Sequence, residues 1–136
     1  MNNRGFTLVE LLTVVAIIGI LSAMTLVTFP AARTRAKDGV IMSDMGQLRA
    51  EAEVIYAQNS NTYTGLGTGV VLTDAWTALI TDINAQCADT AVIGDAAQAY
   101  CVTITLNSGD EWCVDSTGFA GVAAAVLCTD AAFTCE

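Results

Sequence analysis

Hydrophobic positions dominate the first quarter of the chain almost without interruption. Residues 5–30 read GFTLVELLTVVAIIGILSAMTLVTFP, an apolar run that carries one acidic residue, Glu10. About 20 apolar residues suffice for a helix to cross a bilayer. A carboxylate at mid-bilayer costs on the order of 2.5–3.5 kcal/mol, and intramembrane acids usually have a partner or a function. The pattern therefore predicts a membrane-spanning helix in which Glu10 has a specific task.

Two simpler interpretations of this run explain less. A secretory signal has an apolar core of about 7–15 residues that ends at a small-residue cleavage site, whereas this run is longer and contains an acid. A plain single-span anchor explains the length but not Glu10. Arg4 precedes the run, so the leader should stay cytoplasmic and the rest of the chain should face outward.

An amphipathic pattern follows the apolar run. One stripe of apolar residues recurs at spacings of three and four: Ile41, Met45, Leu48, Ala52 and Ile55. This spacing is typical of one face of a helix, and the polar residues 59–61 mark its end. The two patterns together predict a single helix from Phe6 to about Gln58, with Pro30 as a candidate kink. Its apolar half has no partner within the chain, so it must lie in lipid or against copies of itself.

The remaining residues, 61–136, predict a small head that contains both helix and sheet. Four apolar residues recur at helical spacing after Thr73 and Asp74, either of which can cap a short helix: Trp76, Leu79, Ile80 and Ile83. Residues 100–106 and 110–115 alternate between apolar and polar around a glycine-containing loop, which predicts a β-hairpin. Residues 121–127 predict a third strand.

The hairpin pattern also predicts a register. With a three-residue loop and Gly109 in the left-handed conformation, Ile104 lies opposite Trp112. Val102 then lies opposite Val114 on the same face, which should pack on the apolar stripe of the long helix. A two-residue loop would shift the register by one residue and break these pairs.

Charge is distributed unevenly along the 136 residues. The five basic residues all lie at or before Arg49, while eleven acidic residues and no basic ones follow it. A head without cations has no electrostatic footprint for phosphate, so we expect no nucleic-acid binding by the head alone. The acidic surplus indicates solubility and mutual repulsion between heads. The chain has no histidine and no nucleophile beside a plausible base, so we expect neither an enzyme nor a cofactor.

Five cysteines fall in the last fifty residues: Cys87, Cys101, Cys113, Cys128 and Cys135. In an oxidising compartment such a cluster indicates disulfides. Zinc is the alternative, but no C-x-x-C pair is present. We therefore expect two disulfides, one free thiol and no metal, with the pairing open. In the predicted hairpin register, Cys101 and Cys113 are diagonal neighbours and form one candidate bridge.

The N-terminal octapeptide Gly5–Leu12 and its apolar continuation resemble the N-terminus of type IV prepilins and of the related type II secretion pseudopilins. The resemblance implies that a dedicated prepilin peptidase of the inner membrane cuts between Gly5 and Phe6 and methylates the new amine of Phe6. It also implies that Glu10 pairs with the N-terminal amine of a neighbouring subunit, so that Phe6 and Glu10 are assembly residues.

The resemblance further implies an α+β fold, in which the C-terminal half of a long N-terminal helix packs on a small antiparallel sheet. The expected divisions are a leader (1–5), an apolar transmembrane and assembly half-helix (6–30), an amphipathic half-helix (31–60) and a globular head with a connecting loop, a hairpin and a disulfide-bearing C-terminal region (61–136). Pilins often carry a disulfide near the C-terminus, for which Cys128 and Cys135 are the nearest fit. Some major pseudopilins instead bind calcium near their C-terminal loop. The candidate oxygen ligands for calcium in this chain are Asp110, Glu111 and Asp115.

The function implied by the resemblance is structural. The chain would reside in the inner membrane with its head outside the cytoplasm, and pilus assembly machinery would polymerise it with copies of itself into an extracellular type IV pilus used for adhesion, motility or surface attachment. The alternative is a pseudopilin of a type II secretion system. The disulfide-rich end favours the pilus, because calcium is the commoner brace in major pseudopilins.

Overall fold

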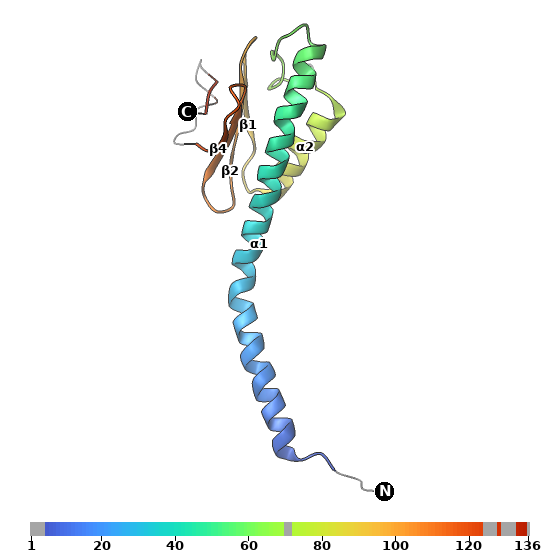
Figure 1. Ribbon diagram of the computed structural model, residues 1–136, viewed down its shortest axis with the longest axis vertical. Helices are drawn as coiled ribbons and strands as arrows, with labels where there is room; N and C mark the ends of the chain where they lie inside the picture. Colours follow the sequence, from blue (N-terminus) through green and yellow to red (C-terminus); the bar gives the residue numbers. More distant parts are fainter. Residues whose placement is uncertain (1–4, 70–71, 124–127, 129–132, 136) are drawn as a thin grey trace. The chain divides into compact units, whose positions relative to one another are not determined.

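The computed structural model describes residues 5–69, 72–123, 128 and 133–135, and the leader residues 1–4 lie outside this set. Its elements are α1 (Leu8–Gln58), α2 (Asp74–Gln86), β1 (Val92–Asp95), β2 (Tyr100–Thr105), β3 (Glu111–Asp115) and β4 (Ala120–Val122) (Figure 1). The chain divides into two compact units, residues 1–34 and 35–136. A long N-terminal helix and a small antiparallel sheet confirm the predicted α+β fold.

The first unit is the apolar part of α1. By length and composition, α1 is the one helix among the described residues that can cross a membrane. The helix continues through Pro30, whose carbonyl accepts a hydrogen bond from Thr34 Oγ1 at 3.2 Å. Thr13 Oγ1 likewise donates to the carbonyl of Glu10 at 3.0 Å. These local bonds satisfy hydroxyl groups that would otherwise be costly in an apolar environment.

The second unit contains the sheet, whose strand order is β1-β2-β3-β4 with every neighbouring pair antiparallel. In the β2–β3 hairpin, Ile104 lies opposite Trp112 and Val102 lies opposite Val114. Gly109 has a φ of 96°, in the left-handed region that glycine adopts without strain. The predicted loop length and register are therefore confirmed.

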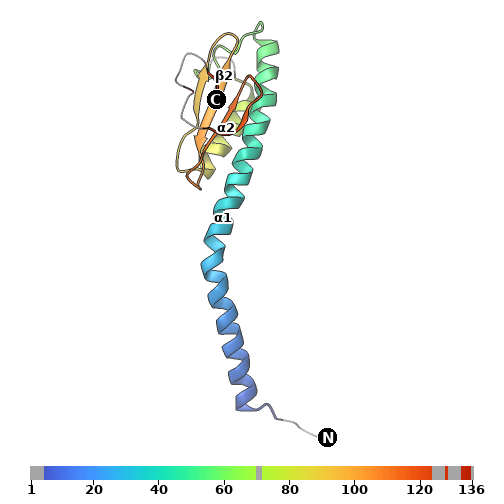
Figure 2. The ribbon, with the colours of Figure 1, turned by 60° about the vertical axis from the view of Figure 1, so that its left-hand side comes forward.

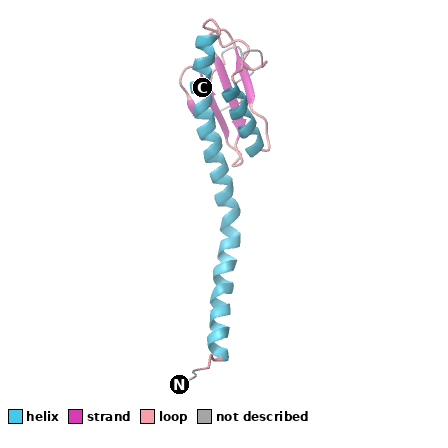
Figure 3. Ribbon diagram, turned by 90° about the vertical axis from the view of Figure 1, so that its right-hand side faces the viewer, coloured by secondary structure: helices cyan, strands magenta, loops and turns pink. Residues whose placement is uncertain are grey.

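The core lies between the helices and one face of this sheet. The C-terminal part of α1 and α2 lie side by side on that face (Figures 2 and 3). The whole predicted stripe of α1 is buried there, in one cluster with Val102, Ile104 and Val114 of the sheet and with Trp76 and Ile83 of α2. Burial of each such side chain stabilises the fold by about 1.5–3 kcal/mol.

The α2 helix begins as its sequence predicts. Thr73 is the N-cap, and its hydroxyl accepts a hydrogen bond from the backbone N–H of Trp76 at 3.1 Å. The same hydroxyl donates to a carboxylate oxygen of Glu51 on α1. One threonine therefore starts the second helix and joins it to the first.

The strands differ from the prediction at both edges of the sheet. β1 was not expected, because its four residues include a glycine and place a single large apolar side chain toward the core. Its Asp95 carboxylate accepts hydrogen bonds from the backbone N–H groups of Gly65 and Gly67, at 2.7 and 2.8 Å, and so holds the connecting loop. The predicted strand 121–127 begins at Ala120, and residues 124–127 lie outside the described set.

A buried carboxylate joins α1 to the hairpin loop. Asp38 is 4% exposed. Its Oδ1 accepts from the backbone N–H and the side-chain amide of Asn107, at 2.9 and 3.0 Å. Its Oδ2 accepts from the backbone N–H of Ser108 at 3.1 Å. Three hydrogen bonds to one carboxylate fix the loop to the helix.

We predict that Asp38→Ala lowers the free energy of unfolding by about 2–4 kcal/mol, because two backbone donors and one amide lose a charged acceptor. Urea unfolding of the full chain in detergent, followed by tryptophan fluorescence, measures this change. Asp89→Ala is the matched control, since Asp89 is exposed, and it should change stability by less than about 0.5 kcal/mol. Equal effects of the two substitutions would contradict a structural role for Asp38.

Candidate assembly site and disulfide-bearing face

The start of α1 is a capping box formed by Thr7 and Glu10. The Thr7 hydroxyl accepts from the backbone N–H of Glu10 at 3.2 Å. In return, Glu10 Oε2 accepts from the backbone N–H and the hydroxyl of Thr7, at 2.9 and 2.8 Å. This reciprocal arrangement satisfies donors that a helix N-terminus otherwise leaves free. The sequence interpretation missed Thr7, although threonine followed by glutamate three residues later is the signature of such a box.

The residues around the predicted cleavage point are accessible. Gly5 and Phe6 precede the helix, and the side chain of Phe6 is 76% exposed. A Cβ atom on Gly5 would meet no other atom within 4 Å. Phe6 and Glu10 lie at the same end of α1, where the Glu10 carboxylate accepts hydrogen bonds from Thr7. Pairing of Glu10 with an amine therefore stays a prediction about a second copy.

The apolar side chains that follow are also exposed in the isolated chain. They include Leu8, Leu11, Val15, Ile18 and Leu21, and each of these is more than half exposed. A helix that is apolar on all sides is typical of one surrounded by lipid or by other helices.

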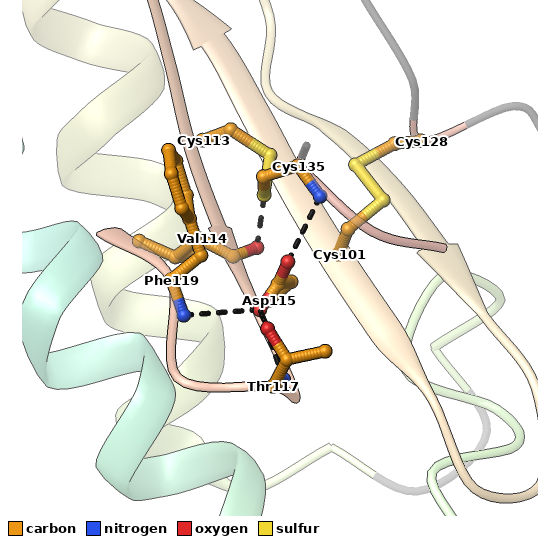
Figure 4. The surroundings of a disulfide bond; sticks show 8 residues. All are labelled: Cys101, Cys113, Val114, Asp115, Thr117, Phe119, Cys128 and Cys135. Carbon is orange, nitrogen blue, oxygen red and sulfur yellow. Dashed lines mark hydrogen bonds between the residues drawn. A yellow bond between two sulfur atoms is a disulfide. The ribbon is translucent and has the colours of Figure 1, made fainter. Parts of the chain in front are cut away.

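Two disulfides cross the outer face of the sheet, on the side away from the helices (Figure 4). They join Cys101 to Cys128 and Cys113 to Cys135, across 27 and 22 residues of sequence. Cys87 is free and half-buried. Two bridges and one free thiol are therefore confirmed.

Both candidate pairings from the sequence are wrong. Cys101 lies opposite Asp115, and Cys113 lies opposite Thr103, so the two strand cysteines are diagonal neighbours. Diagonal residues are about 7–8 Å apart, which exceeds the usual Cα separation in a disulfide. Each strand cysteine instead bonds to one cysteine of the C-terminal segment, so Cys128 and Cys135 do not pair with each other.

Gly94 of β1 makes room for this segment. A Cβ atom at this position would lie 2.1 Å from the backbone carbonyl oxygen of Cys128 and 2.7 Å from the ring of Phe133. The backbone of Cys128 cannot move aside to relieve such an overlap, as the end of a flexible side chain could. The absence of a side chain at Gly94 therefore permits the close approach of the C-terminal segment to the sheet.

Asp115 also holds the C-terminal segment to the sheet. It is 1% exposed, and its Oδ2 accepts from the backbone N–H of Cys135 at 2.8 Å. Its Oδ1 accepts from the backbone N–H of Thr117 at 2.9 Å, from the hydroxyl of Thr117 at 2.7 Å and from the backbone N–H of Phe119 at 3.1 Å (Figure 4). Burial works to raise the pKa of Asp115, but these hydrogen bonds outweigh it and hold the pKa below its ordinary value.

The free thiol and the acids of the hairpin have features of structural residues, not of reactive or metal-binding ones. Burial raises the pKa of the Cys87 thiol, and the nearby carboxylates of Asp38 and Asp89 add to this effect, so the reactive thiolate is disfavoured. Asp115, one of the candidate calcium ligands, is committed to the bonds just described. Among the described residues, no group of three or more acidic, cysteine or histidine side chains is placed to hold a metal ion.

Comparisons with known proteins agree with this geometry. The family model of the prokaryotic N-terminal methylation motif matches residues 1–26. The chain is 29% identical over 116 residues to the type IV wide pilus major component PilA4 of Thermus thermophilus, an alignment that covers 82% of this chain and 79% of that protein. In these respects the chain is similar to type IV pilins. It is also 43% identical over 51 residues to the type IV major fimbrial protein FimA of Dichelobacter nodosus, covering 38% of this chain and 33% of FimA.

No solved structure gave a significant match. The similarity to pilins therefore depends on the methylation motif and on sequence similarity to pilus and fimbrial subunits. The long helix, the four-stranded antiparallel sheet and the disulfide-bearing end are consistent with a pilin fold.

We predict that Asp115→Asn destabilises the head by about 2 kcal/mol or more at neutral pH, because charge-assisted hydrogen bonds become neutral ones. The pKa of Asp115 is lowered in the folded chain, so its contribution is complete above pH ~4 and is lost as the pH falls through the lowered value. Urea unfolding of the oxidised chain between pH 2 and 7 should show the two proteins converging in acid. A difference that is independent of pH would show that the Asp115 charge is not responsible.

Proposed function

We propose that the chain is a structural subunit that polymerises through the apolar half of α1 into an extracellular type IV pilus. The observation that carries this proposal is the helix that is apolar on all sides, exposed in the isolated chain, with one acid at its start. The relatives PilA4 and FimA are named as major components of pili and fimbriae, which favours a pilus over the pseudopilus of a secretion system.

Before assembly, the bilayer covers this apolar surface, with the head outside the cytoplasm. Removal of the leader by prepilin peptidase between Gly5 and Phe6, with methylation of Phe6, leaves an amine at the end of the apolar helix. In a filament, copies of the same helix replace the lipid. Moving an apolar side chain from lipid to a neighbouring helix gains little free energy, because both surroundings are apolar. Polar pairing must therefore set the register of neighbouring subunits.

Glu10 is suited to that pairing. Both hydrogen bonds that it accepts within the chain use Oε2. Within the described part of the chain, Oε1 is left for another donor. Glu10 can therefore keep the start of its own helix capped while Oε1 accepts from the Phe6 amine of a neighbouring subunit, where an unpaired charge would be costly.

We predict that Glu10→Ala abolishes filaments while leaving membrane insertion and cleavage intact. An amine left unpaired among apolar helices costs about 3–5 kcal/mol at each contact, which is multiplied along a filament. The measurement is the amount of the chain in filaments sheared from cells, together with its intact mass, which should show loss of residues 1–5 and one added methyl group.

Thr7→Val is the matched control, because it removes the capping hydroxyl but keeps the Glu10 carboxylate. Loss of a cap costs about 1 kcal/mol, so we expect filaments from this variant. If Thr7→Val abolishes filaments as Glu10→Ala does, Glu10 acts only as a cap. Normal filaments from Glu10→Ala would also defeat the proposed pairing.

A further inference from the structure

Three of the five basic residues of the chain follow the apolar run of α1 directly: Arg33, Arg35 and Lys37. All three side chains are exposed. Residues 11–37 contain no acidic residue, and no ion pair to these three side chains occurs among the described residues. The end of the apolar run therefore carries a concentrated positive charge that its own stretch of helix does not balance.

The next acid in the sequence does not balance this charge either. Asp38 is buried, and its carboxylate accepts hydrogen bonds from Asn107 and Ser108 of the hairpin loop. Its charge is therefore committed to donors within the head, and the three cations are left for a partner outside the chain.

An aromatic ring orients the first of these cations. The guanidinium carbon of Arg33 lies 5.1 Å from the centre of the Phe29 ring, one helical turn earlier, which is the geometry of a cation–π interaction. A guanidinium that stacks by its face keeps the N–H groups of its edge available, and their fork matches the oxygens of a phosphate. Phe29 thus holds Arg33 in an orientation that suits a phosphate.

The position of Arg33 along α1 matches the phosphate layer of a bilayer. The helix from Leu8 to Phe29 is about 32 Å long at ~1.5 Å per residue, and the hydrocarbon core of a bilayer is about 30 Å thick. The headgroup layer adds about 5–7 Å on each side. Arg33 lies about 4.5 Å beyond Pro30 along the axis, and the long basic side chains that follow it can extend toward the interface.

The side of the membrane on which these cations lie also calls for a partner. Basic residues usually collect on the cytoplasmic side of a span, whereas only Arg4 precedes this one and three basic residues follow it closely. Eleven acidic residues and no basic ones come after Arg49, so an anionic membrane surface repels the head. Cations at the base of the head offset that repulsion.

We propose that Arg33, Arg35 and Lys37 bind the phosphate groups of anionic phospholipids in the outer leaflet of the membrane that α1 spans, with Arg33 oriented by Phe29. This inference rests on the membrane stage of the proposed function and not on polymerisation. The contacts mark the outer boundary of the span. They therefore fix the depth at which Glu10, at the other end of the apolar run, lies before assembly.

A carboxylate of a second copy is the competing partner for these cations. The first two acids of α1 beyond the apolar run, Asp38 and Asp44, are buried within their own chain. Lipid phosphates, in contrast, lie at the level of the residues that directly follow a span, before any second copy is bound. Lipid is therefore the partner that the position of the cations favours.

Lipid retention by the full chain tests the proposal. The chain is placed in bilayer nanodiscs of equal phosphatidylglycerol and phosphatidylcholine with the same acyl chains, and the lipids that stay bound on release are counted by native mass spectrometry. All chains carry Arg4→Gln, so that the leader does not contribute. Phosphatidylglycerol should be retained at least about fivefold over phosphatidylcholine, the equivalent of about 1 kcal/mol.

The combined substitutions Arg33→Gln, Arg35→Gln and Lys37→Gln should abolish this preference. Urea unfolding of the head should not change, because the three side chains are exposed. A preference that survives in this triple variant, or that is absent from its parent, would overturn the proposal.

A charge-matched variant separates position from net charge. The triple variant is given three new cations by Val54→Arg, Ala57→Arg and Gln58→Lys, at exposed positions of α1 that lie about 26 Å or more beyond Lys37. The preference should stay lost, because these cations are too far along the helix to reach the phosphates. Recovery of the preference would show that net charge alone retains the lipid, and would rule out a site at the end of the span.

Phe29→Leu tests the orienting role of the ring, because it keeps an apolar side chain and removes the stacking surface. The preference should fall about two- to fivefold, the equivalent of about 0.5–1 kcal/mol for an exposed cation–π interaction. Unchanged retention would mean that Phe29 does not orient Arg33 toward the lipid.

Failure of this inference is distinguishable from failure of the proposed function. If the chain does not insert into bilayers, the membrane stage of the proposed function fails and the lipid contact fails with it. If the chain inserts but shows no preference for the anionic lipid, only the lipid contact is wrong. If the triple variant keeps the preference yet yields no filaments from cells, the three cations serve a second copy instead, and the lipid contact is again wrong.

Discussion

Packing of one stripe of α1 against the sheet is the interaction on which the rest of the structure depends. The side chains from Ile41 to Ile55 are buried against the apolar face of β2 and β3. Without this contact, a small four-stranded sheet has no core of its own. Because the same continuous helix begins with residues that are exposed on all sides, one element both organises the head and presents the surface that other copies are proposed to cover.

Acidic side chains connect parts of the head that the hydrophobic core does not reach. Asp38, Asp95 and Asp115 each accept backbone N–H groups from segments distant in sequence: the hairpin loop, the connecting loop and the C-terminal end. The acidic composition suggested solvated charges that repel one another. For Asp95 and Asp115, which belong to the acidic region after Arg49, this interpretation was wrong, since a carboxylate with several donors is a strong structural connector.

Local patterns determined which parts of the fold were predictable. The stripe of α1 and the loop at Gly109 depend on neighbouring residues, and spacing alone identified them. The cap of α2 is also local, but the sequence left it open between Thr73 and Asp74, and the structure has Thr73. β1 and the disulfide pairing depend on where the C-terminal segment crosses the sheet, which no local pattern specifies. At the assembly end, the position of Glu10 was evident from the sequence, whereas its bonds to Thr7 needed the folded helix start.

The close contact between Gly94 and the C-terminal segment has a consequence for sequence divergence. The C-terminal segment passes so close to this glycine that even a methyl group would collide with its backbone. A homologue with a side chain at this position must therefore hold its C-terminal segment farther from this strand. The residue that aligns with Gly94 becomes a marker by which the path of the C-terminal segment can be inferred in related chains, independently of how many cysteines they contain.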